Sequence, residues 1–348
     1  MKSQSPRQRR LLILLALSFI VCGGLCAPQV SDAQTQTPAA VQTPTPAPEQ
    51  TDEPPPPPAL PVRLDVIVSD ESNRFVAGLR PEDFHVEVNG VPQKIMSFSD
   101  EAPPLSYSLL VDNTGSLRTL FDPVLRTGAA IIAGKSPRDE MSVVRFVSRE
   151  RIQLMQDFTR NPNALVAALD EMYIEGGHTA LLEALYVAAE TVVTRTPGAD
   201  GSRALVVITD GGERDPRTKL DEVLKYLRRH NVPVFVLGLT DAMSGDDFDQ
   251  VKGGRRGARE LLETLARETG GHAVFPKKPA EFEDAALALN ARLLMPRYTL
   301  GFTSSLAAMN KPLKIEVKLA DSVRNDERKP RLLRVNFRMR GANAPTRK

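Results

Sequence analysis

Apolar runs alternate with segments of helical periodicity through the middle of the chain, between about residues 104 and 293. Runs such as 107–111 and 204–209 contain few polar residues, which predicts strands buried on both faces. Apolar strands separated by helices are typical of a mostly parallel sheet with helices on both faces, so we expect an α/β, Rossmann-like domain here. The expected strands are 107–111, 141–147, 152–158, 204–209, 232–239 and 272–275, and the expected helices are 121–133, 161–172, 179–193, 220–230, 258–269 and 281–294.

Alternation of apolar and polar positions, the period of a half-buried strand, flanks this domain on both sides. Asn89-Gly90 predicts a hairpin turn ahead of a strand over 91–98. Neither flank has enough apolar positions for a core of its own. We therefore expect 61–100 and 297–340 to pair as one flanking β-sandwich-like module, with the α/β domain at 104–293 inserted between them. The expected strands are 62–68, 84–88, 91–98, 298–302, 313–319 and 332–339.

The first 27 residues have the pattern of a secretory signal peptide. Arg7, Arg9 and Arg10 precede an apolar run of 11 residues, which is shorter than a membrane span of about 20 residues. Small residues follow, so cleavage is expected after Ala27 or as late as Ala33. We expect a protein that is exported to the periplasm, the cell surface or the medium. The alternative is a membrane anchor formed by this segment if it is not cleaved.

Residues 28–60 are dominated by Gln, Thr, Pro and Ala and include a run of prolines at 54–58. This composition predicts a disordered linker that favours extended polyproline conformations. The two cysteines, Cys22 and Cys26, both lie in the signal peptide. The mature protein would then contain no thiol and would depend on its core for stability. Residues 341–348 are expected to form a short tail.

The formal net charge is +2, and removal of the four basic residues of the signal peptide leaves −2. Basic and acidic residues are interspersed, so the charge argues against a nucleic-acid-binding protein. Trp is absent and aromatic residues make up only 5% of the chain, which argues against stacking platforms for sugars or bases. We therefore expect no nucleic-acid partner.

Three short polar segments fall at the ends of expected strands or at the start of an expected helix. These segments are Asp112–Ser116 after the strand 107–111, Gly176–Thr179 before a helix, and Thr209–Gly212 at the end of the strand 204–209. Sites in α/β folds lie at the carboxyl ends of the strands. Alternate residues of an extended loop point the same way, so Asp112, Thr114 and Ser116 are expected to point at one place.

Two carboxylates and three hydroxyls are hard oxygen ligands, which suit Mg²⁺ or Mn²⁺, with Ca²⁺ as a further candidate. Such a set leaves the ion with excess positive charge, so it still attracts an outside carboxylate. Each segment alone has a simpler interpretation: the two Asp segments as turns and the Thr as a helix N-cap. Their combination, in this order and at these positions, indicates a metal site. The predicted ligands are Asp112, Thr114, Ser116, Thr179 and Asp210.

The same residues resemble the metal-ion-dependent adhesion site (MIDAS) of the von Willebrand factor A (VWA) family. The family pattern is Asp-x-Ser-x-Ser, then a Thr, then an Asp, and here Thr114 replaces the first Ser. The resemblance covers about 104–293, and the flanking patterns at 76–84 and 298–302 look like those of exported bacterial VWA proteins. It implies a VWA fold and a non-enzymatic, metal-dependent binding or adhesion module. The implied partner is a protein that presents an Asp or Glu to the metal.

Two other functions remain open. A metal-dependent hydrolase or phosphotransferase would need a general base, and Glu213, expected in the loop after Asp210, is the nearby candidate. The third possibility is a scaffold whose metal site is vestigial. Gly134-Lys135-Ser136 is similar to part of a nucleotide-binding loop, but we interpret it as a helix C-terminus. Residues 253–257 are expected to form a basic loop.

Overall fold

The computed structural model describes residues 59–71, 74–196, 202–214, 217–243, 253–305, 314–324 and 334–340. The predicted signal peptide, nearly all of the predicted linker and the predicted tail lie outside these residues. Within the described part of the chain, no helix combines the length and the apolar character needed to cross a membrane.

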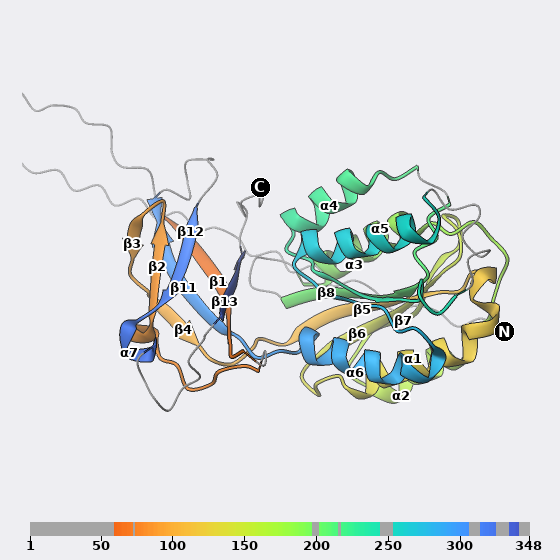
Figure 1. Cartoon of the computed structure of the whole chain (residues 1–348), viewed down its shortest axis with the longest axis horizontal. Coiled ribbons are helices and arrows are strands. Elements are labelled where there is room, and N and C mark those ends of the chain that lie inside the picture. Colours follow the sequence, from red (N-terminus) through yellow and green to blue (C-terminus); the bar gives the residue numbers. More distant parts are fainter. Residues whose placement is uncertain are drawn as a thin grey trace, which may run out of the picture. The chain divides into compact units, whose positions relative to one another are not determined.

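A six-stranded sheet forms the centre of the α/β domain (Figure 1). Its strand order is β10-β9-β8-β5-β6-β7, and every neighbouring pair is parallel except β6 and β7. β5 and β8 lie in the middle and are buried along their whole length, which accounts for the apolar runs 109–111 and 204–208. The expected α/β fold is confirmed. The strands are β5 Leu105–Asp112, β6 Glu140–Phe146, β7 Ile152–Thr159, β8 Ser202–Thr209, β9 Val234–Gly238 and β10 Ala273–Val274.

Helices cover both faces of this sheet. Figure 1 shows α3, α4 and α5 on one face and α1, α2 and α6 on the other. Two apolar clusters fill the layers between the helices and the sheet. Gly134 ends α1 ahead of a strand, as predicted for the segment that is similar to a nucleotide-binding loop. The helices are α1 Phe121–Ala133, α2 Pro162–Asp170, α3 Leu181–Arg195, α4 Leu220–Arg229, α5 Gly254–Thr269 and α6 Phe282–Leu293.

The flanking segments form two further sheets. One has the order β13-β1-β11-β4, with all pairs antiparallel, and in the other β2 lies between β12 and β3. Both sheets therefore combine strands from before and after the α/β domain, and they share one apolar core. The predicted pairing of the two flanks is confirmed. The elements are β1 Leu60–Ser69, β2 Phe84–Val88, β3 Val91–Gln93, β4 Ser97–Ser99, β11 Tyr298–Ser304, β12 Ile315–Leu319, α7 Asp321–Arg324 and β13 Arg334–Arg340.

Two expectations about local structure are wrong. The stretch 91–98 is not one strand, because β3 pairs with β2 in one sheet while β4 pairs with β11 in the other. The stretch 253–257 is not a loop, because it forms the start of α5 after Gly253, whose φ is 79°. In both places tertiary packing decides between alternatives that the local sequence leaves open. The Asn89-Gly90 turn is as predicted, with φ of 51° and 81°.

Candidate metal centre

The first loop of the predicted site begins at the last residue of β5. Asp112 is fully buried, and its Oδ1 accepts hydrogen bonds from the Thr114 backbone N–H at 3.0 Å and the Thr114 hydroxyl at 2.7 Å. The Thr114 hydroxyl lies 3.1 Å from the Ser116 hydroxyl. The alternation predicted an extended loop, but the loop is not extended throughout, because a 3-10 helix begins at Gly115. The tight turn nevertheless keeps Ser116 beside Thr114, so the two hydroxyls meet.

The second loop follows β8, which is the parallel neighbour of β5. The Ser116 hydroxyl donates to Asp210 Oδ2 at 2.7 Å. In the opposite direction, the Thr209 hydroxyl donates to Asp112 Oδ2 at 2.6 Å. These two bonds link the loops through both carboxylates of the predicted site.

Backbone geometry fixes the shape of the Asp210 loop. Gly211 has a φ of 75°, and a Cβ at this position would lie 2.9 Å from the Leu262 side chain, so the position requires glycine. The Gly211 N–H donates to the Thr209 hydroxyl at 3.0 Å, and the Gly212 N–H donates to Asp210 Oδ1 at 2.7 Å. Both oxygens of the Asp210 carboxylate are therefore oriented by named donors.

The pKa of Asp112 is raised from 3.8 to about 7. Burial is the largest cause, and the negative charge of Asp210 adds to it. Hydrogen bonds from Thr209 and Thr114 lower the pKa but do not restore its ordinary value. The two largest causes both disfavour the ionised carboxylate. A divalent cation near the two carboxylates would favour it.

Thr179 lies two residues ahead of α3 and is 1% exposed. Its hydroxyl oxygen is buried and has no hydrogen-bond partner in the described part of the chain. Thr179 is not the helix N-cap, because the residue in that position is Ala180, whose side chain forms no hydrogen bond with the helix. A buried hydroxyl without a partner carries a desolvation penalty. Thr179 thus has an oxygen available for a ligand.

An ion-pair network fixes the loop that carries Thr179. Glu175 accepts hydrogen bonds from Arg145 and Arg151, one on each carboxylate oxygen and each at 2.7 Å. The Glu175 backbone N–H donates to the Asn113 carbonyl at 3.0 Å. This loop therefore lies against the loop that follows β5.

The structure joins four of the five predicted ligands through hydrogen bonds. Thr179 is tied to the same region by its carbonyl, which accepts from the Arg214 N–H at 2.9 Å. Among the described residues, no group of three or more His, Cys, Asp or Glu side chains could hold a metal, and the predicted set contains only two carboxylates. Metal binding itself remains a prediction. The four joined residues are Asp112, Thr114, Ser116 and Asp210.

Two residues contribute to the site beyond the predicted ligands. Thr209 holds Asp112, and the sequence indicated this only by a hydroxyl at the end of a buried strand, directly before Asp210. Glu213 lies in the loop after Asp210, as expected, and its Oε2 accepts the Leu182 N–H at 2.8 Å. That oxygen holds the start of α3 rather than a group at the predicted metal position.

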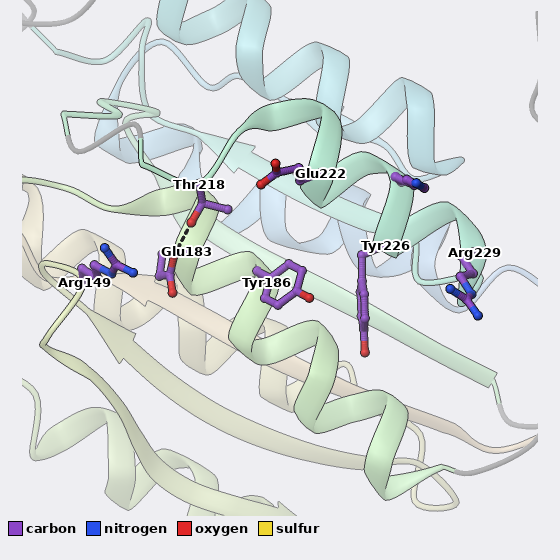
Figure 2. Close-up of a pocket in the computed structure, with 8 residues that line it drawn as sticks. Arg149, Glu183, Tyr186, Thr218, Glu222, Tyr226 and Arg229 are labelled. Carbon is purple, nitrogen blue, oxygen red and sulfur yellow. Dashed lines mark hydrogen bonds between the residues drawn. The ribbon is translucent and has the colours of Figure 1, made fainter.

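A groove of about 480 Å³ lies between α3 and α4, apart from the predicted ligands (Figure 2). The rings of Tyr186 and Tyr226 pack in it with centroids 4.9 Å apart. At one end the Thr218 hydroxyl donates to the Glu183 carboxylate. The groove is lined by Arg149, Glu183, Tyr186, Thr218, Glu222, Lys225, Tyr226 and Arg229.

The region that holds this site matches a known family. Residues 108–286, just over half of the chain, match the von Willebrand factor type A domain. The chain belongs to the von Willebrand factor type A domain family. The match spans all three loops that carry the predicted ligands. No curated protein matches the chain.

Three solved structures are similar to parts of the chain, each with a TM-score of 0.43. One is an aerotolerance-related membrane protein from Bacteroides fragilis, with 19% identity over 54% of this chain and 98% of that chain. Another is the conserved hypothetical protein BatB from Bacteroides thetaiotaomicron, with 16% identity over the same shares. The third is a von Willebrand factor type A protein from Catenulispora acidiphila, with 15% identity over 66% of this chain and 50% of that one. These identities are too low to transfer a function.

Proposed function

We propose that this chain is an exported, divalent-metal-dependent protein-binding module. Its VWA domain would hold Mg²⁺, or alternatively Mn²⁺ or Ca²⁺, and a partner protein would present an Asp or Glu to the ion. The observation that supports this most directly is the buried pair of Asp112 and Asp210, two like charges connected through hydroxyl groups. The ligands would be Asp112, Thr114, Ser116, Thr179 and Asp210.

The donor set fits a hard cation on two further grounds. All five side chains offer oxygen, which Mg²⁺, Mn²⁺ and Ca²⁺ prefer. The Thr179 hydroxyl is buried without a partner among the described residues, so coordination would remove its desolvation penalty. A bound ion would supply positive charge that attracts a carboxylate of the partner in a partly dry site.

We favour binding over catalysis because of Glu213. A hydrolase or phosphotransferase would need a general base near the ion, and the candidate carboxylate already accepts the Leu182 N–H. Turnover of phosphoesters or peptides by the metal-loaded protein, lost in Glu213→Gln, would support catalysis instead. A scaffold with a vestigial site would bind neither metal nor a metal-dependent partner.

Titration calorimetry with Mg²⁺, Mn²⁺ and Ca²⁺ tests the metal site directly. Wild type is expected to bind at least one of these ions, and Asp112→Asn is expected to bind none of them measurably. Glu140→Gln is the matched control, because it removes a carboxylate at the opposite end of the same sheet. Equal binding by all three proteins, or none by wild type, would contradict the proposal.

The partner and the export are tested separately. Capture of a partner protein by the immobilised chain should require the metal, should fail with a chelator and should fail with Asp112→Asn. N-terminal sequencing of the protein recovered outside the cytoplasm should give a start after Ala27 or Ala33. A start at Met1 in a membrane fraction would support an uncleaved anchor.

A further inference from the structure

The N-terminus of α3 is capped from another loop. The first backbone N–H groups of a helix have no partner within the helix, and a side chain at the N-cap position usually accepts one of them. Here the N-cap residue is Ala180, whose methyl group cannot accept a hydrogen bond. Glu213, from the loop after β8, accepts the N–H of Leu182, the second residue of the helix, at 2.8 Å.

The loop after β8 contacts the start of α3 at two further points. The Arg214 backbone N–H donates to the Thr179 carbonyl at 2.9 Å. Figure 2 shows the Thr218 hydroxyl beside the Glu183 carboxylate, to which it donates a hydrogen bond. The loop that carries Asp210 is thereby fastened to the segment that carries Thr179.

In this arrangement the cap of α3 and the Thr179 hydroxyl are separate. A Thr at the start of a helix commonly uses its hydroxyl as the cap. The Thr179 hydroxyl does not, since it has no hydrogen-bond partner among the described residues. Because Glu213 accepts the helix N–H instead, the Thr179 oxygen is not needed to stabilise α3.

We infer that Glu213 is a positioning residue for metal binding, which holds Thr179 in register with the Asp210 loop by capping α3 from that loop. The inference rests on the proposed function, because it concerns the same metal. It predicts that Glu213 affects metal affinity through the link between two loops, and not through the stability of α3 alone.

The test compares Mg²⁺ titrations of full-length variants, using Mn²⁺ or Ca²⁺ instead if wild type binds one of them more tightly. Glu213→Ala is expected to weaken metal binding about 10- to 100-fold, the usual range for residues that orient metal ligands. Glu213→Gln is expected to stay within a few-fold of wild type, because its amide oxygen can still accept the Leu182 N–H. Asn161→Ala is the matched control: it removes the N-cap of α2, where Asn161 accepts the Asn163 N–H at 3.0 Å, and should leave metal affinity unchanged.

The double variant Glu213→Ala with Ala180→Ser separates positioning from helix stability. The serine offers α3 a local cap, so the melting temperature should recover towards that of wild type, while the metal affinity should remain low. Recovery of both quantities would overturn the inference and leave Glu213 as a helix cap only. This variant also covers the case in which Glu213→Ala alone does not fold.

Hydrogen exchange of the metal-free protein provides a readout that does not depend on metal. The peptide that contains Leu182 should exchange faster in Glu213→Ala than in wild type, and Asn161→Ala should not change it. If wild type binds metal and Glu213→Ala binds it equally well, the inference is wrong and the proposed function stands. If wild type binds no metal, the proposed function is wrong and the inference fails with it.

Discussion

Carboxylates lie at both ends of the central sheet, in opposite electrostatic surroundings. At the start of β6, Glu140 accepts hydrogen bonds from two Arg195 nitrogens at 3.0 Å each and from the Ser106 hydroxyl at 2.9 Å. The hydrogen bond from Arg195 is the largest cause of a lowered Glu140 pKa. At the ends of β5 and β8, Asp112 is close to Asp210, and its pKa is raised to about 7.

The number of hydrogen bonds does not explain the difference. Asp112 accepts three: two from Thr114 and one from Thr209. Glu140 also accepts three. What differs is burial and the sign of the neighbouring charge, which is positive at Glu140 and negative at Asp112.

The two ends therefore suit different roles. The Glu140 end is electrostatically balanced within the protein and contributes to the fold. The Asp112 end retains an unfavourable charge interaction that a cation from outside would relieve. In this domain, the end of the sheet where buried charges remain unbalanced is the end that we assign to ligand binding.

The largest expected effect concerns stabilisation by metal. Mg²⁺ at about 100 times its dissociation constant should raise the free energy of unfolding of wild type by about 2.7 kcal/mol, because the ion binds only the folded site. Denaturant titrations with and without Mg²⁺ measure this. Glu140→Gln should keep the gain and Asp112→Asn should lose it. The proposed difference between the two ends of the sheet is contradicted if both variants lose the stabilisation by Mg²⁺, or if both keep it.

The next effect is a pH dependence of opposite sign at the two ends. For Asp112, the pKa is raised on folding, so the metal-free protein should lose stability as the pH rises from about 3.8 to about 7, where the unfolded chain has already released this proton. For Glu140, the pKa is lowered below 4.5, so its contribution is present above that value and is lost as the pH falls.

Differences between variants and wild type isolate these two groups from the other carboxylates. Asp112→Asn should remove the loss of stability between about pH 3.8 and pH 7. Glu140→Gln should cost about 1 kcal/mol or less at neutral pH, since the Arg195 side chain is 50% exposed and water screens the pair. Unfolding followed from pH 3 to pH 8 with a chelator present gives both slopes. Slopes of the same sign would remove the contrast.

The ends of the sheet also differ in how far the sequence predicts them. The positions of the buried strands and of the three loops near Asp112 follow from apolar runs that stop at polar residues, because a buried strand must end where polar groups begin. The order of the strands in the sheet does not follow from these runs. The pairing of Glu140 with Arg195 does not follow, because the two lie 55 positions apart on different elements and their pairing depends on packing.

The same limit applies inside the candidate site. The pattern identifies Asp112 and Asp210, but it does not show that Glu213 caps α3 in place of Thr179. A Thr before a helix predicts a cap from local geometry, but the N-cap residue of α3 is Ala180, and the helix N–H is accepted by Glu213 across 31 positions. Likewise, the division of 91–98 between two sheets depends on β11, which lies about 200 residues further along the chain and pairs with β4, while β3 pairs with the nearby β2.

The smallest expected effect concerns one hydroxyl at each end. Thr179→Val replaces a buried hydroxyl, which has no partner in the part of the chain that the structure describes, by a methyl group of similar shape, so the metal-free protein should gain up to about 1 kcal/mol or stay unchanged. Ser106→Ala removes a hydrogen bond to Glu140 and should lose about 1 kcal/mol. Mg²⁺ affinity should fall in Thr179→Val and stay constant in Ser106→Ala. If Thr179→Val instead destabilises the metal-free fold while leaving Mg²⁺ affinity intact, then the Thr179 hydroxyl serves the fold, and the contrast between the two ends of the sheet does not extend to this residue.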